Sequence, residues 1–137
     1  MNIVTETISV KTSKRNQMVD ITSQVADVVS SSGIASGDCI IFCNHTTGGI
    51  TINENADPDV VHDMLMTLEE LFPQDRRGYR HAEGNSDSHI KSTLVGCSEQ
   101  VLVEHSSLVL GTWQGIYFCE FDGPRSRKVT VQIKGTL

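Results

Sequence analysis

Apolar residues recur along the chain with two different spacings, and the shorter one dominates. A period of two runs through residues 2–12, and residues 37–45 read as a second strand with both faces buried. The step TTGG at 46–49 leads into a short strand at 50–53, which predicts that these two strands pair across a glycine-rich turn. The last β-rich segments are separated by turn-like residues and predict an antiparallel meander; they lie at 99–105, 107–111, 114–122 and 127–135.

Helical spacing is found in two longer segments. The clearer one follows Asp57, the predicted N-cap, with Pro58 as its first helical residue and Pro73 just beyond its end. A shorter helix is predicted between Thr22 as N-cap and Gly33 as the residue that ends it. The apolar stripe of the clearer helix has i, i+3, i+4 spacing and comprises Val60, Val61, Met64, Leu65, Leu68 and Leu71.

A third, short helix is predicted after a polar loop, with Asp87 as its cap and Gly96 at its end. The chain then has about seven mostly antiparallel strands and about three short helices. This pattern indicates an α+β fold built on a β-sandwich. A length of 137 residues predicts one domain, residues 1–137, which is large enough to bury a core.

The net charge and the length of the apolar runs exclude some classes of binding partner. The net charge of −6 argues against nucleic-acid binding, which needs clustered Lys and Arg, although a local basic patch can hold one small phosphorylated ligand. No apolar run approaches the ~20 residues that span a bilayer, and the first residues lack the features of a signal peptide, so we expect a cytoplasmic protein without membrane partners. The four cysteines form no CxxC pair, and we expect them to be reduced and mostly buried thiols.

The candidate chemistry concentrates in RHAEGNSDSH, residues 80–89, just before the third helix. His81 and His89 lie there, and His45 ends the second strand. Neutral imidazole is the commonest metal ligand, so these three side chains are candidates for a zinc site with an open position. The spacing leaves open the alternative that they only form hydrogen bonds. His62 and His105 are interpreted as surface residues.

Other polar residues lie where elements begin or end. Glu54 and Asn55 precede the Asp57 cap and have no capping duty, so they are candidates for a site. Trp113 and Gln114 occupy a predicted turn, where a lone tryptophan can also cap the core. Two interpretations are open for Arg125 and Arg127. They can form ion pairs with the carboxylates of Glu120 and Asp122, or they can bind an anionic ligand. No phosphate loop, dinucleotide fingerprint, nucleophile elbow or HExxH motif is present.

Three long stretches resemble the signature blocks of the YjbQ-like proteins, also called the secondary thiamine-phosphate synthase family. They read HTTGGITINENADPDV, YRHAEGNSDSHIKSTLVG and LVLGTWQGIYFCEFDGPR, in that order. The resemblance implies a homotrimer of α+β subunits whose sandwiches pack around a threefold axis. It also implies that His45, His81 and His89 meet and hold a divalent metal, for which zinc is our expectation.

The activity implied by the resemblance is a weak thiamine-phosphate synthesis. It joins a pyrimidine methyl diphosphate to a thiazole phosphate with loss of pyrophosphate. The alternative is a trimer that binds a metal or a small phosphorylated molecule without turnover. The resemblance suggests as candidate catalytic residues Glu54, Glu83 and Glu120, and as candidate ligand-binding residues Asn55, Arg80, Asn85, Asp87, Trp113, Gln114 and Arg125.

Overall fold

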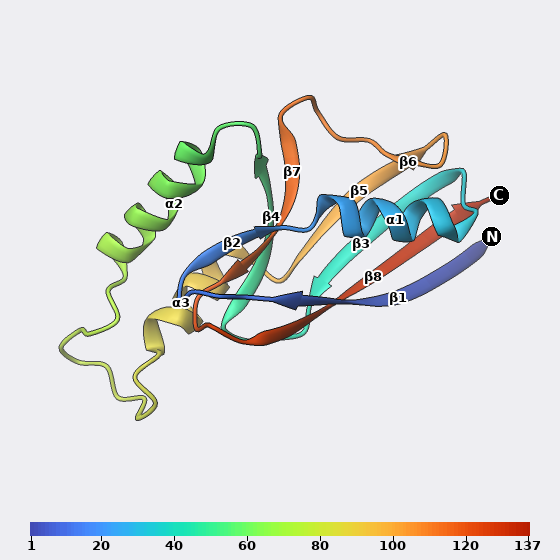
Figure 1. Ribbon diagram of the computed structural model, residues 1–137. Helices are drawn as coiled ribbons and strands as arrows, with labels where there is room; N and C mark the ends of the chain where they lie inside the picture. The colour runs from blue at the N-terminus through green and yellow to red at the C-terminus, as the bar shows by residue number, and fades with distance from the viewer.

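The computed structural model describes residues 1–137 and shows two antiparallel sheets packed as a sandwich with three helices (Figure 1). The larger sheet has the order β1-β8-β3-β5-β6, and the smaller has the order β2-β7-β4. The elements in chain order are β1 (Asn2–Lys11), β2 (Gln17–Asp20), α1 (Thr22–Ser32), β3 (Ser36–Cys43), β4 (Gly48–Glu54), α2 (Pro58–Leu71), α3 (Ser86–Val95), β5 (Ser98–Glu104), β6 (Ser107–Leu108), β7 (Gln114–Glu120) and β8 (Ser126–Thr136).

The main core lies on one face of the larger sheet, which α1 and the smaller sheet cover together (Figure 1). Alternate residues of β8, Val129, Val131 and Ile133, point into it and are fully buried, as the period of two requires. From the smaller sheet, Ile116 and Phe118 of β7 close the core from the other side. Burial of this many aliphatic side chains supplies most of the driving force for folding.

The outer face of the smaller sheet carries a second, smaller cluster. Tyr117, Cys119 and Phe121 are its buried members, and Leu65 and Leu68 of α2 pack against them. Although α2 is amphipathic, none of its residues is buried. A three-stranded sheet offers too little surface to cover the whole apolar stripe of the helix, so part of that stripe stays open.

The strand pairing differs from the sequence-based prediction. The expected hairpin between 37–45 and 50–53 is wrong, because β3 belongs to the larger sheet and β4 pairs with β7 in the smaller one. Gly49 is required by close packing instead of by a hairpin, since a Cβ there would lie 2.6 Å from the carbonyl oxygen of Gly96. The predicted meander holds only for β5 and β6, and β2 was missed.

Burial of the second strand was also overstated. The face with Cys39, Ile41 and Cys43 is buried as predicted, but Phe42 on the opposite face is 41% exposed, because no layer covers that side of the larger sheet. The β1 strand and the ends of β8 lie within one or two residues of their predicted limits.

Three predicted helix ends are confirmed, among them Gly96 after α3, and two predicted N-caps are corrected. Asp57 caps α2 by accepting the backbone N–H of Asp59, and Gly33 ends α1 with a positive φ of 76°. Thr22 is the first residue of α1 and not its cap. Asp87 does not cap α3, because its carboxylate is fully buried in ion pairs; Asn85 holds the cap position.

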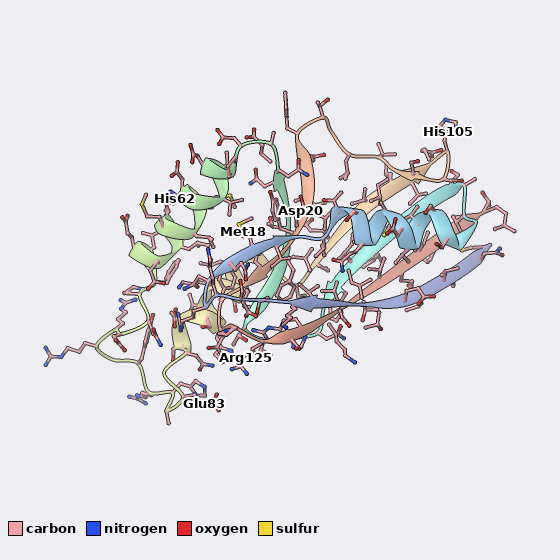
Figure 2. All side chains as sticks on the ribbon, in the orientation of Figure 1. Met18, Asp20, His62, Glu83, His105 and Arg125 are labelled. Carbon is pink, nitrogen blue, oxygen red and sulfur yellow. The ribbon has the colours of Figure 1, made fainter.

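The exposure of the remaining histidines and of the cysteines can also be compared with the prediction. His62 lies on the outer side of α2 and His105 at the β5–β6 turn, both exposed, as predicted (Figure 2). The four cysteines are free thiols, three of them buried and Cys97 exposed. None of the three helices has the length and apolar character needed to cross a membrane.

Candidate functional site

A buried ion pair fixes the loops at one end of the sandwich. Glu120, the last residue of β7, is completely buried, and Arg127 of β8 donates to it from Nε at 2.8 Å. The carboxylate also accepts the Thr12 hydroxyl at 2.8 Å and the backbone N–H of Asp122 at 3.0 Å. Arg127 reaches on to the hydroxyl of Thr47 at 2.9 Å. Burial alone would raise the pKa of Glu120, but these donors hold the pKa below its ordinary value.

A second buried carboxylate anchors the start of α3. Arg15 binds Asp87 with two hydrogen bonds of 2.9 Å, and Lys91, one turn further along α3, donates at 2.8 Å. Lys91 is itself only 1% exposed and has a second partner in Glu69 of α2 at 2.6 Å. Burial opposes ionisation of Asp87, but the hydrogen bonds from Arg15 and Lys91 outweigh it and lower the pKa. Both charges therefore belong to the frame that holds α3 against β2 and α2.

Asn85 and Arg125 converge on one further carboxylate. Asn85 donates to Asp122 at 2.8 Å, and Arg125 donates to the same side chain at 3.1 Å. The amide oxygen of Asn85 is buried and has no hydrogen-bond partner. In this structure Glu120, Asp87 and Arg125 are all engaged by protein groups, and their predicted catalytic and ligand-binding roles stay predictions.

On this frame the three candidate histidines lie near one another. The rings of His81 and His89 meet edge to face, with centroids 5.4 Å apart and planes at 79°. His45 and His89 line a shared cavity of about 460 Å³ together with Cys97. The structure thus brings His45, which is distant in the sequence, beside His89, whose ring contacts that of His81. We call this region, with its loops, the histidine end.

One ring nitrogen of His45 is engaged in a hydrogen bond with the backbone. Its Nε2 accepts the backbone N–H of Lys128 at 3.1 Å. Because a backbone amide can only donate, the neutral ring carries its proton on Nδ1. Burial first, and then the nearby Arg127, lower the pKa of His45. The ring is therefore neutral at neutral pH and offers a donor, not an acceptor, on its free side.

The loop before α3 adds positive charge beside the histidines. Arg76, Arg77 and His81 line a cavity of about 380 Å³ together with one carboxylate, that of Asp75. Tyr79, Arg80, His81 and His89 line a neighbouring cavity of about 560 Å³. None of these three arginines forms an ion pair within the chain. The buried hydroxyl of Tyr79 has no hydrogen-bond partner. The surface therefore presents three unpaired guanidinium groups to a ligand, whereas the Tyr79 hydroxyl lies beneath it.

The histidines do not by themselves form a complete metal site within one chain. No group of three or more His, Cys, Asp or Glu side chains is gathered as metal ligands. His45 directs Nε2 at a backbone amide, which leaves His81 and His89 as the close pair. Two imidazoles suit zinc by donor type, but tetrahedral zinc sites use three or four protein ligands. The three-histidine zinc site stays a prediction, and no step below depends on it.

Four predicted site residues lie elsewhere. Glu54 and Gln114 are paired across β4 and β7, whereas Gly48 and Glu120 are paired at the other end of the same ladder. Six residue steps at about 3.3 Å each separate the two ends by about 20 Å. Asn55 and Trp113 adjoin Glu54 and Gln114, with the Asn55 N–H donating to the Trp113 carbonyl at 3.0 Å. We call this region the tryptophan end.

Glu83 is the predicted carboxylate that does lie at the histidine end. Its Oε2 is 3.8 Å from Nε2 of His81, on a loop directed away from the sheets (Figure 2). Both side chains are largely exposed, so this ion pair is weak.

Sequence reasoning missed several of the residues that shape the histidine end. The spacing of Asp87 and Lys91, four residues apart on one helix, is a signal that could have been used. Arg76, Arg77 and Tyr79 were a visible basic-aromatic run beside Arg80. Nothing in the local sequence points to Arg15 or Cys97, because their neighbours come from distant segments.

Comparison with known proteins places these features in a family. The model of the UPF0047 protein YjbQ-like family matches residues 6–136. The UPF0047 protein YugU of Bacillus subtilis is 53% identical, with 95% of this chain and 98% of the relative covered. A UPF0047 protein of Methanocaldococcus jannaschii is 51% identical over 92% of this chain and 91% of its own.

Comparison with solved structures gives the same family. An uncharacterised conserved YjbQ/UPF0047 protein from Clostridium acetobutylicum superimposes with a TM-score of 0.92 at 54% identity, covering 94% of this chain and 99% of its own. A protein of unknown function from Sulfolobus solfataricus gives 0.93 at 36% identity, with 98% of both chains covered. The match extends over nearly the whole fold, including both ends of the smaller sheet. The chain therefore belongs to the YjbQ/UPF0047 family.

Proposed function

We propose that the histidine end binds a small phosphorylated molecule. The observation that carries this proposal is the set of unpaired guanidinium groups of Arg76, Arg77 and Arg80 around the two loop cavities. Guanidinium groups bind phosphate with paired hydrogen bonds, and three of them on a chain of net charge −6 form a local site for an anion.

We further propose that the bound molecule is a pyrimidine methyl diphosphate, which reacts with a thiazole phosphate. The ring nitrogen of the thiazole forms a bond to the methylene carbon, and the bond from that carbon to the diphosphate oxygen breaks. Both electrons of the broken bond leave with pyrophosphate. The arginines stabilise the charge that develops on the leaving group, and His81 or His89 in its protonated form donates a proton to it.

The test is to supply both precursors and measure thiamine phosphate and released pyrophosphate. We expect His89→Ala to lower the rate by about 100-fold, the lower range for loss of a general acid. His62→Ala, which removes an exposed histidine from α2, is the matched control and should leave the rate unchanged. Equal rates for the wild-type protein and His89→Ala would show that the histidine end is not the catalyst.

Binding without turnover is the second candidate. It is favoured by the position of the predicted catalytic carboxylates, since Glu120 is buried in an ion pair and Glu54 lies at the other end of β4. Under this function the diphosphate binds with a stoichiometry of one per site and no pyrophosphate appears. Arg77→Ala then weakens binding in calorimetry, whereas His89→Ala has no rate to change.

A further inference from the structure

The residues of the tryptophan end form a polar cluster that has no ligand-sized cavity of its own. Tyr117 donates from its hydroxyl to the carbonyl of Glu54 at 3.0 Å, and Asn55 donates to Asp20 at 3.2 Å. Asn55 lies directly over Gly115, where a Cβ would come within 2.4 Å of its amide nitrogen. The cluster is thus held in place, yet Trp113 beside it is 63% exposed. A fixed polar group with an exposed tryptophan is typical of a contact surface.

Charge is distributed unevenly between the two ends. Residues 44–68 contain no Lys or Arg, and around the start of α2 they carry the carboxylates Glu54, Asp57, Asp59 and Asp63. Within the chain, Glu54, Asp57 and Asp59 have no basic partner. The loop at the histidine end has the opposite sign and is likewise unpaired, through Arg76 and Arg77. The two ends are therefore complementary surfaces on one molecule.

Apolar surface is left open between these charged regions. Val60, Met64 and Leu68 of α2 line a groove of about 560 Å³ with Leu94 and Val95 of α3. Leu94 is 60% exposed, and no residue of α2 is buried. An open apolar groove with charged surfaces of opposite sign around it is the pattern of a protein interface.

We propose that the tryptophan end of a second copy of this chain docks at the histidine end and completes the site. Glu54 and Asn55 of the second copy then face His81 and His89 of the first. The acidic start of α2 in the second copy meets Arg76 and Arg77, and the groove between α2 and α3 is covered by the contact.

The second copy is the occupant because each surface is complementary to one on the same chain about 20 Å away. Contact between two different surfaces is head to tail, and such contacts close into a ring when the rotation allows it. The inference deepens the proposed function and rests on it, because it adds Glu54 of the second copy to a site where one chain supplies only the exposed Glu83 beside His81. Its test uses no ligand, so the two can fail separately.

The single tryptophan of the chain supplies the first readout. Trp113 of the unmodified protein is expected to resist quenching by acrylamide at high protein concentration and to become several-fold more accessible on dilution. Sedimentation of the same samples should show the assembly dissociating over the same range. A tryptophan that stays fully accessible while the protein is assembled would overturn the proposed contact.

Cross-linking then identifies which ends meet. In a Cys97→Ser background, which removes the exposed thiol, Ala82→Cys marks the histidine end and Thr112→Cys the tryptophan end. The two variants are co-expressed with different tags and treated with a short bismaleimide. We expect a linked pair carrying both tags, and a several-fold lower yield in high salt because the contact is charged.

The matched control replaces Thr112→Cys with Ser31→Cys, an exposed position on α1. The proposal is wrong if the Ala82–Thr112 pair links no more than this control does. A link in the cysteine variants, together with neither thiamine-phosphate synthesis nor diphosphate binding by the unmodified protein, would leave the contact standing and refute the proposed function. Activity or binding with no link would do the reverse.

Discussion

Removing Arg127 tests whether the buried ion pair holds the histidine end together. In Arg127→Met the carboxylate of Glu120, which is 0% exposed, loses its only basic partner and keeps the Thr12 hydroxyl and the Asp122 N–H. Breaking a buried pair from one side costs about 3–5 kcal/mol, since a charge is left uncompensated. In a domain of this size each kcal/mol lowers Tm by roughly 3–5 °C, so Tm should fall by roughly 10–25 °C.

The measurement is urea unfolding at pH 7, followed by circular dichroism, with thermal melts as a second readout. Arg125→Met is the matched control, because Arg125 pairs with Asp122 at 54% side-chain exposure and such pairs contribute less than about 1 kcal/mol. The double variant Glu120→Leu/Arg127→Met should recover most of the loss, because replacing both partners removes the unpaired charge. The reasoning is refuted if Arg127→Met costs no more than Arg125→Met.

Three further outcomes follow from the ionisation of individual groups. Asp87 and Glu120 have lowered pKa values, so their contribution to stability is complete above pH ~5 and is lost as the pH falls through their folded values; urea midpoints at pH 7, 4 and 3 should decline in that order. His45 should titrate below pH ~6.5 and show the Nδ1-protonated tautomer in long-range 1H–15N spectra, and a midpoint above 6.5 would contradict its assigned environment. Cys97 should be the one thiol that reacts quickly with a chromogenic disulfide in the native protein, and Cys97→Ser should abolish that fast phase.

The elements that the sequence predicted best are those whose signal is local. Asp57 and Pro58 determine where α2 begins through cap chemistry and a fixed φ, and Gly33 ends α1 because it adopts a positive φ. The alternation in β1 and β8 reflects a single buried face. None of these depends on which other segment is packed nearby.

The pairing between strands could not be predicted from local signals, because it depends on segments that are distant in the sequence. Gly48 and Gly49 have the composition of a hairpin turn, yet they are small because β4 packs against Gly96 and Phe118. A pair of glycines in a sequence indicates either a closely packed backbone or an unusual φ. Which of the two applies depends on the segment that packs against it. The four-residue strand β2 lies in a segment rich in Lys, Arg and Gln, so its membership of the smaller sheet comes from β7 and not from its own pattern.

For the site, one error could have been avoided from the sequence. Trp113 and Glu120 were assigned to one polar constellation, although a strand between them must hold their ends about 20 Å apart. The approach of His45 to His89 could not be read from spacing, because it depends on α3 packing against β4, where Ser92 donates to the carbonyl of Gly48 at 2.6 Å.

The two buried carboxylates explain why the histidine end can be both rigid and open. Glu120 and Asp87 are ionised because Arg127, Arg15 and Lys91 surround them, and together they tie β7, β8, α3 and the loop before β2 into one unit. Outside this unit, the loop arginines form no ion pair, and His81 has only the exposed carboxylate of Glu83 at 3.8 Å. Because the pKa values of the frame carboxylates are lowered and His45 is neutral at neutral pH, the frame keeps one charge state across the neutral range.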